Sequence, residues 1–174
     1  MMSGIGKKIF GKIVHSFPLF LLFFLTLTGF DLSFFFSEKN FSFNFIYIVI
    51  FYWILKKPNS LGYGFIFFAG IINDVVQNFP IGISSINYLI LCAIAAFVRA
   101  RTLLPNLFYD WVLFFIAILI VSSINFSILA LIFNRQIEYG NLMFNSFITF
   151  LIYPILSKIF ERIYLLNLNQ ENAE

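Results

Sequence analysis

One acidic side chain, Asp74, lies inside an apolar stretch of this 174-residue chain. A carboxylate at the centre of a membrane-spanning helix costs about 2.5–3.5 kcal/mol, so such a residue needs a structural or functional reason. Asp74 could be a proton or ligand site, a contact with a partner protein, or an acceptor for the backbone N–H groups of the turn Asn78–Gly82. We favour the last role, in which Asp74 fixes the connection between two helices.

The residues needed for catalysis or metal binding are missing from the sequence. His15 has no carboxylate near it along the chain, and we assign it an interfacial position. One histidine and one cysteine, Cys92, cannot supply the four ligands of a structural zinc site. Gly62-Tyr63-Gly64 is not followed by the Lys-Ser or Lys-Thr pair of a phosphate-binding loop, and neither an acidic cluster for magnesium nor a GxSxG element is present. The sequence therefore predicts a protein that is not an enzyme and has no cofactor or metal.

The composition identifies the class of protein. Hydrophobic residues make up 61% of the chain, aromatic residues 21% and charged residues 11%. Average soluble domains carry about 25% charged residues, so these charges are too few to cover a water-soluble globule. A soluble enzyme, a nucleic-acid-binding domain, a secreted disulfide scaffold and a disordered protein are thereby disfavoured, and a polytopic membrane protein remains. The net charge of +3 fits cations gathered on the cytoplasmic side of a membrane rather than a nucleic-acid partner.

Six apolar stretches predict an all-α integral membrane protein with six transmembrane helices in one domain. A β-barrel is disfavoured, because its strands would alternate apolar and polar residues. Runs such as Leu19–Leu25 show no such alternation. We read Tyr47, Tyr52 and Trp53 as part of an interfacial aromatic belt. Residues 167–174 are expected to form a polar cytoplasmic tail. The six expected spans cover about residues 13–30, 41–55, 61–79, 83–98, 111–133 and 141–157.

The distribution of cations predicts the orientation in the membrane. If the N-terminus is inside, each cytoplasmic segment carries at least two of the chain's 11 Lys and Arg residues. Lys39 and Arg135 are then the two cations outside. We therefore expect an inner-membrane protein with both termini in the cytoplasm. The cations assigned to the inside are Lys7, Lys8, Lys12, Lys56, Lys57, Arg99, Arg101, Lys158 and Arg162.

Small residues predict where the third and fourth spans pack. Gly62, Gly70 and Asp74 share one helical stripe on the third span. Such faces let two membrane helices approach closely. We expect a tight hairpin between the two spans, turning through Pro80 and Gly82. The facing stripe expected on the fourth span consists of Cys92, Ala96 and Ala100.

The fifth and sixth spans carry polar side chains at helical spacing. These residues indicate either hydrogen bonds between helices, which we favour, or a polar cavity or lateral partner face. Pro154 is expected to kink the inner end of the sixth span. The polar residues are Ser122, Ser123, Asn125 and Ser127 on the fifth span, and Asn141, Asn145, Thr149 and Tyr153 on the sixth.

The segment from Lys57 to Arg101 resembles the MreD family of rod shape-determining membrane proteins, most closely its alphaproteobacterial branch. The motif is Gly70-x-x-x-Asp74, then Pro80-x-Gly82, then an apolar span that ends in Arg99 and Arg101. A second match is Tyr153-Pro154, followed by Lys158 and Arg162. The candidate structural or partner-interface residues are Gly70, Asp74, Pro80, Gly82, Asn145, Thr149, Tyr153 and Pro154.

The resemblance implies a non-catalytic membrane scaffold of the cell-elongation machinery that organises peptidoglycan synthesis. It implies MreC as the direct partner, and MreB, RodZ, RodA and its penicillin-binding transpeptidase as the wider complex. It also implies a fold similar to the six-helix substrate-binding subunit of energy-coupling-factor transporters. Within the lipid bilayer, partner helices would dock on small or polar faces.

The alternative function is a substrate-capturing membrane subunit of a vitamin transporter. Such subunits commonly carry a small Ala-x-x-x-Ala face on the first span, and residues 14–30 of this chain contain no alanine. A lipid-modifying enzyme is a third possibility, for which the sequence offers no plausible nucleophile or metal site.

Overall fold

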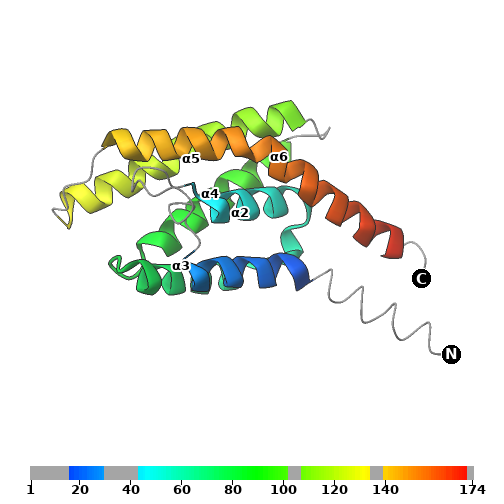
Figure 1. The fold of residues 1–174 in the computed structure, drawn as a ribbon, viewed down its shortest axis with the longest axis horizontal. Helices are drawn as coiled ribbons and strands as arrows, with labels where there is room; N and C mark the ends of the chain where they lie inside the picture. Colours follow the sequence, from blue (N-terminus) through cyan, green and yellow to red (C-terminus); the bar gives the residue numbers. More distant parts are fainter. Residues whose placement is uncertain (1–15, 30–42, 102–106, 134–138, 172–174) are drawn as a thin grey trace.

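The computed structural model describes residues 16–29, 43–101, 107–133 and 139–171. The described part of the chain contains six α-helices and one short 3-10 helix, which confirms the all-helical prediction (Figure 1). Several residues to which we assigned positions above lie outside the described residues: Lys7, Lys8, Lys12, His15, Lys39 and Arg135. The elements are the helix Ser16–Thr28, α2 (Phe45–Lys56), η2 (Pro58–Ser60), α3 (Tyr63–Gln77), α4 (Ile83–Arg101), α5 (Leu107–Leu131) and α6 (Tyr139–Glu171).

Three of these helices, α4, α5 and α6, are long and apolar enough to cross a membrane. The helix Ser16–Thr28, α2 and α3 are shorter apolar helices of 10–17 residues. At 1.5 Å per residue, a helix of that length extends about 15–26 Å, less than the roughly 30 Å of the hydrocarbon core. The sixth helix continues well past the expected span of residues 141–157 and ends at Glu171.

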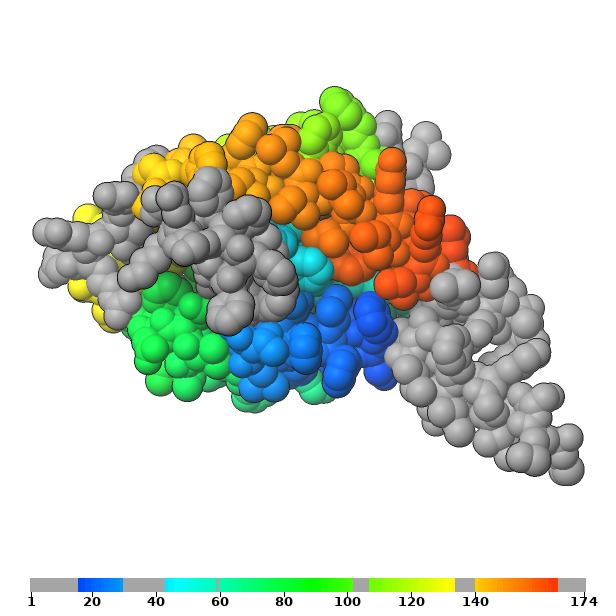
Figure 2. All heavy atoms as spheres, in the orientation of Figure 1, coloured from blue at the N-terminus to red at the C-terminus, as the bar shows by residue number. Residues whose placement is uncertain are grey.

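Helix α2 forms the centre of the bundle. Its residues from Tyr47 to Ile54 are all buried, and at about 100° per residue they cover every side of the helix. It packs against α4 and α6, and in Figure 2 its cyan surface is visible next to the orange part of α6. The predicted aromatic belt is therefore wrong for Tyr47, Tyr52 and Trp53, because the surrounding helices bury all three side chains.

Aromatic rings join the central helix to α5 and α6. The ring of Tyr153 stacks on Phe114, with centroids 4.3 Å apart, and meets Phe51 edge-on at 6.1 Å. Phe51 also contacts Phe114 at 5.0 Å. Aromatic pairs of this kind contribute about 0.5–1.5 kcal/mol each beyond their buried area. These three rings therefore fix the positions of three helices relative to one another.

Helix α6 runs through Pro154 without ending. Figure 1 shows the helix changing direction between its orange and red parts, as expected for an internal proline. Pro154 has no N–H, so the carbonyl of Phe150, four residues earlier, loses its helical donor. The indole Nε1–H of Trp111 in α5 donates to that carbonyl at 2.8 Å. The two rings also stack, with centroids 4.5 Å apart, so α5 supplies the partner that the kink requires.

Candidate functional site

Asp74 holds the connection between α3 and α4. Its side chain is fully buried. Its Oδ2 accepts the backbone N–H of Gly82 at 2.7 Å, and its Oδ1 accepts the N–H of Ser84 at 2.9 Å. Gly82 immediately precedes α4 and Ser84 lies in its first turn, where the N–H groups of a helix have no partner within the helix. The sequence analysis expected Asp74 to accept N–H groups of the turn Asn78–Gly82, and Gly82 is one of its two donors. The other donor, Ser84, lies just beyond that turn, inside α4.

The turn itself depends on two unusual backbone conformations. Asn78 ends α3 in the left-handed region, with φ of 54° and ψ of 36°. Gly82 has φ of +103°, a conformation that side-chain-bearing residues rarely adopt. Between them, the carbonyl of Pro80 accepts the N–H of Ile83 at 3.4 Å. The Pro-x-Gly motif therefore lets the chain reverse direction within a few residues.

The two helices approach each other most closely at Gly70. A Cβ atom built on Gly70 would lie 2.4 Å from the Cα of Ser85 and 2.6 Å from its nitrogen. Only glycine fits there without moving the backbone of α4. The hydroxyl of Ser85 donates to the carbonyl of Phe67 at 2.9 Å, and Nδ2 of Asn73 donates to Oγ of Ser84 at 3.0 Å. We call Gly70, Asn73, Asp74, Gly82, Ser84 and Ser85 the α3–α4 joint.

The hairpin was predicted correctly, but the surface expected to face Gly70 was wrong. Gly70 meets Ser85 in the first turn of α4 rather than the stripe from Cys92 to Ala100. Cys92 is buried, whereas Ala100 is exposed. The reason is the short turn: in an antiparallel hairpin, residues just before the turn must face residues just after it.

The polar stripe of α6 points into the bundle at Thr149 and Tyr153, whereas Asn141 at its start is exposed. Thr149 is fully buried; its hydroxyl accepts the backbone N–H of Asn44 at 3.0 Å and donates to the carbonyl of Asn145 at 2.7 Å. Ser146, one residue beyond Asn145, shares a 2.8 Å hydrogen bond with Ser122 of α5. Hydrogen bonds between the fifth and sixth helices, which the sequence predicted, are therefore present.

A polar cavity of about 170 Å³ lies between the helices. The sequence analysis singled out Ser122, Asn125 and Asn145, which line it, but missed Asn44 and Asn87. The signal for Asn87 was its position three residues after Ser84, on the same face of α4. The described residues that line it are Gly29, Phe43, Asn44, Phe45, Ile46, Tyr47, Asn73, Gln77, Phe79, Ser84, Asn87, Tyr88, Ser122, Asn125, Leu142 and Asn145.

The candidate residues thus fall into two groups. Gly70, Asp74, Pro80 and Gly82 belong to the hairpin between α3 and α4. The other four, Asn145, Thr149, Tyr153 and Pro154, lie on α6. The two groups do not form one site, but the cavity borders both, because its lining includes Asn73 and Ser84 of the joint as well as Asn145. Within the described residues, no group of three His, Cys, Asp or Glu side chains could hold a metal ion.

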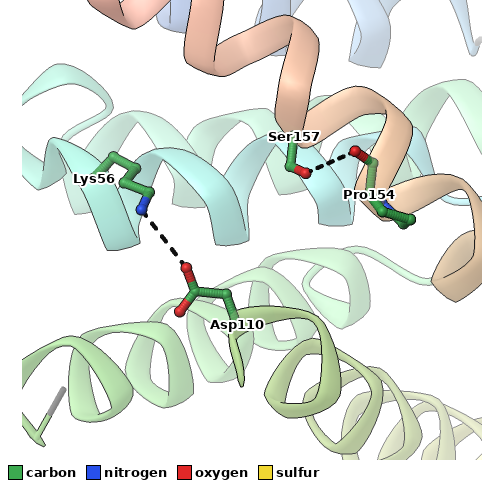
Figure 3. A network of polar contacts seen from close by, with 4 residues as sticks. All are labelled: Lys56, Asp110, Pro154 and Ser157. Atoms are coloured by element: carbon green, nitrogen blue, oxygen red, sulfur yellow. Dashed lines mark hydrogen bonds and ion pairs between the residues drawn. The ribbon is translucent and has the colours of Figure 1, made fainter. Parts of the chain in front are cut away.

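An ion pair joins two helices at another point. Nζ of Lys56, in the last turn of α2, lies 3.6 Å from Oδ2 of Asp110, in the first turn of α5 (Figure 3). Asp110 is buried and Lys56 is about a quarter exposed, at 26%. The same view shows Ser157 donating to the carbonyl of Pro154 at 3.0 Å, just beyond the kink of α6. Both contacts are structural links within the bundle.

Comparison with known families identifies the chain. A family model described as rod shape-determining protein MreD matches residues 11–163, which is well over half of the sequence. The chain therefore belongs to the MreD family, whose members are non-catalytic membrane proteins. No curated protein and no solved structure matches it. The alphaproteobacterial branch and the likeness to energy-coupling-factor subunits stay predictions.

Proposed function

We propose that this member of the MreD family acts in rod-shape determination as a scaffold that pairs with MreC in the bacterial inner membrane. Through MreC it would contribute to the complex of MreB, RodZ, RodA and the penicillin-binding transpeptidase, and so organise peptidoglycan synthesis. The family membership supports the role in cell shape. The observation that supports a scaffold is the α3–α4 joint, where buried groups of the chain hold one another in place.

A scaffold needs a fixed outer surface, and the joint supplies one. Gly70 and Asp74 face α4, so their contribution to a partner contact would be to position the exposed side chains of α3. Phe65, Phe68 and Val75 of α3 are all more than half exposed. In lipid, helices associate through close packing and hydrogen bonds rather than through hydrophobicity. A partner helix therefore requires a surface of constant shape, which a rigid hairpin provides.

The proposed orientation keeps both termini in the cytoplasm. Cations lie in the last turns of α2 and α4 and in the second half of α6. Figure 1 shows the connection between α2 and α3 at the right, toward the red end of α6, with the turn between α3 and α4 at the left. An excess of Lys and Arg at one end of a bundle favours that end as the cytoplasmic one. The joint would then lie toward the periplasm.

The vitamin-transporter alternative is less well supported. Drug-sized ligands usually occupy pockets of about 300–1,000 Å³, whereas the polar cavity measures about 170 Å³. The scaffold remains the function that we propose.

The scaffold proposal can be tested with a matched pair of glycine variants. Gly70 and Gly64 lie on the same helix, but a Cβ on Gly64 would meet nothing within 4 Å. We expect Gly70→Leu to abolish co-purification with MreC and to turn rod-shaped cells round, while Gly64→Leu preserves both. The amount of each variant in the membrane is measured alongside, and Gly70→Ala replaces the leucine variant if that variant does not accumulate. Intact MreC binding and rod shape in a Gly70 variant would refute the proposal.

A further inference from the structure

The polar cavity has an unusual lining for the interior of a membrane bundle. Five of its lining residues are asparagines, and they come from five different segments of the described chain: the start of α2, α3, α4, α5 and α6. These are Asn44, Asn73, Asn87, Asn125 and Asn145. Amide groups away from water require hydrogen-bond partners, so a cavity lined by so many needs an explanation.

Two of these amides have an unpaired oxygen. Asn87 is 2% exposed, and its Oδ1 has no hydrogen-bond partner in the described part of the chain. Oδ1 of Asn125, on α5, is also buried without a partner there. Buried side-chain oxygens are nearly always hydrogen-bonded in native proteins, so an exception calls for a missing donor.

Several neighbouring polar groups are already engaged elsewhere. Nδ2 of Asn73 donates to Ser84 at 3.0 Å. Ser122 pairs with Ser146 at 2.8 Å. Asp74 accepts two backbone N–H groups. Asn73, Ser84 and Ser122 thus line the cavity with hydrogen bonds already made, whereas Asp74 lies behind the lining. The donors for the two amide oxygens can then be hydroxyl groups of molecules inside the cavity, either water or a ligand that displaces it.

The lining also limits the chemistry of that molecule. Among the described residues that line the cavity there is no Asp, Glu, Lys, Arg or His, so these residues offer no countercharge to a charged ligand. Aromatic rings form other parts of the wall, where Tyr47 and Tyr88 meet edge-to-face with centroids 5.9 Å apart. The ligand should therefore be neutral, with O–H donors on one side and C–H groups on the other.

The volume limits its size. A protein cavity of about 150 Å³ holds one benzene molecule, which has six heavy atoms, and this cavity measures about 170 Å³. We propose that the cavity binds one small neutral polyol, of the size of glycerol or erythritol, whose hydroxyl groups donate to Asn87 and Asn125. The polyol is either a free molecule or the neutral glycerol headgroup of a lipid. This inference does not rest on the pairing with MreC.

The experiment uses the full-length protein in nanodiscs of phosphatidylcholine, prepared without glycerol. Saturation-transfer NMR with erythritol tests the free polyol, and native mass spectrometry with monoolein tests the lipid headgroup. We expect saturable binding in at least one arm. Erythritol binding alone assigns a free polyol, and monoolein binding alone assigns a lipid. Absence of saturable binding in both arms overturns the proposal.

Asparagine-to-leucine variants show whether binding occurs in this cavity. Asn87→Leu and Asn125→Leu each remove an acceptor and should weaken binding at least tenfold. Asn141→Leu is the matched control, because Asn141 is exposed and does not line the cavity. The Asn87 variant should still fold, since replacing an unpaired buried oxygen by an apolar group removes an unfavourable interaction, and its unfolding temperature checks this. Unchanged binding in the folded Asn87 variant would overturn the assignment.

Discussion

Replacing Gly70 by alanine tests the close approach of α3 and α4 with a single methyl group. The new Cβ would lie 2.4 Å from the Cα of Ser85. To reach the roughly 3.4 Å at which ordinary carbon contacts begin, the two backbones must separate locally by about 1 Å. That movement also disturbs the hydrogen bond from Ser85 to the carbonyl of Phe67. The matched control is Gly64→Ala, because nothing lies within 4 Å of a Cβ at that position.

The magnitude follows from two opposing terms. Alanine is favoured over glycine inside a helix by up to about 1 kcal/mol, and this gain applies to both variants. Extra atoms in a packed interior cost about 1–3 kcal/mol, and a weakened hydrogen bond between membrane helices costs about 0.6 kcal/mol. We therefore expect Gly64→Ala to be neutral or slightly stabilising, and Gly70→Ala to be less stable than this control by about 2–4 kcal/mol.

The chain offers its own reporter for this measurement. Cys92 is the single cysteine, lies on α4 and is 1% exposed. A fluorophore that reacts with thiols should label it only when the bundle opens, so labelling on heating in detergent records the unfolding temperature. At about 2–4 °C per kcal/mol, the two variants should differ by about 4–16 °C. If Gly70→Ala unfolds at or above the temperature of Gly64→Ala, the close contact is not as described and the reasoning fails.

Four further outcomes can be checked, the first three by the same thermal assay. Asp74→Ala leaves the buried N–H of Ser84 and the partly buried N–H of Gly82 without an acceptor and should cost about 1–4 kcal/mol; an unchanged unfolding temperature would contradict the turn-fixing role. Trp111→Phe keeps the ring stacked on Phe150 but removes the donor to its carbonyl, and should cost about 1–3 kcal/mol; equal stability would mean that the kink needs no donor from α5. Lys56→Met should cost about 1–3 kcal/mol, and adding Asp110→Asn should restore part of this loss; additive effects would exclude the ion pair. Reporter fusions should place both chain ends in the cytoplasm, and opposite sides would refute the proposed orientation.

Much of the architecture follows from local properties of the sequence. The low charge content and the apolar stretches identify a helical membrane protein, because hydropathy depends only on residues near each other along the chain. The turn through Pro80 and Gly82 was predictable for the same reason, since proline and glycine restrict or permit particular backbone conformations wherever they occur. Asp74 lies only a few residues from that turn, so its backbone partners were also within reach of sequence reasoning.

The arrangement of the helices was decided by the tertiary structure. A helix that faces lipid and a helix enclosed by protein are equally apolar, so the sequence could not tell that α2 is central or that Trp53 is buried. The sequence also could not predict that Gly70 lies opposite Ser85. That pairing depends on the distance between the two helix backbones, and residue types alone do not specify this distance. The cavity collects asparagines from separate helices, and their convergence exists only after those helices have packed. Hydropathy is a property of each segment, whereas burial is a property of the whole bundle.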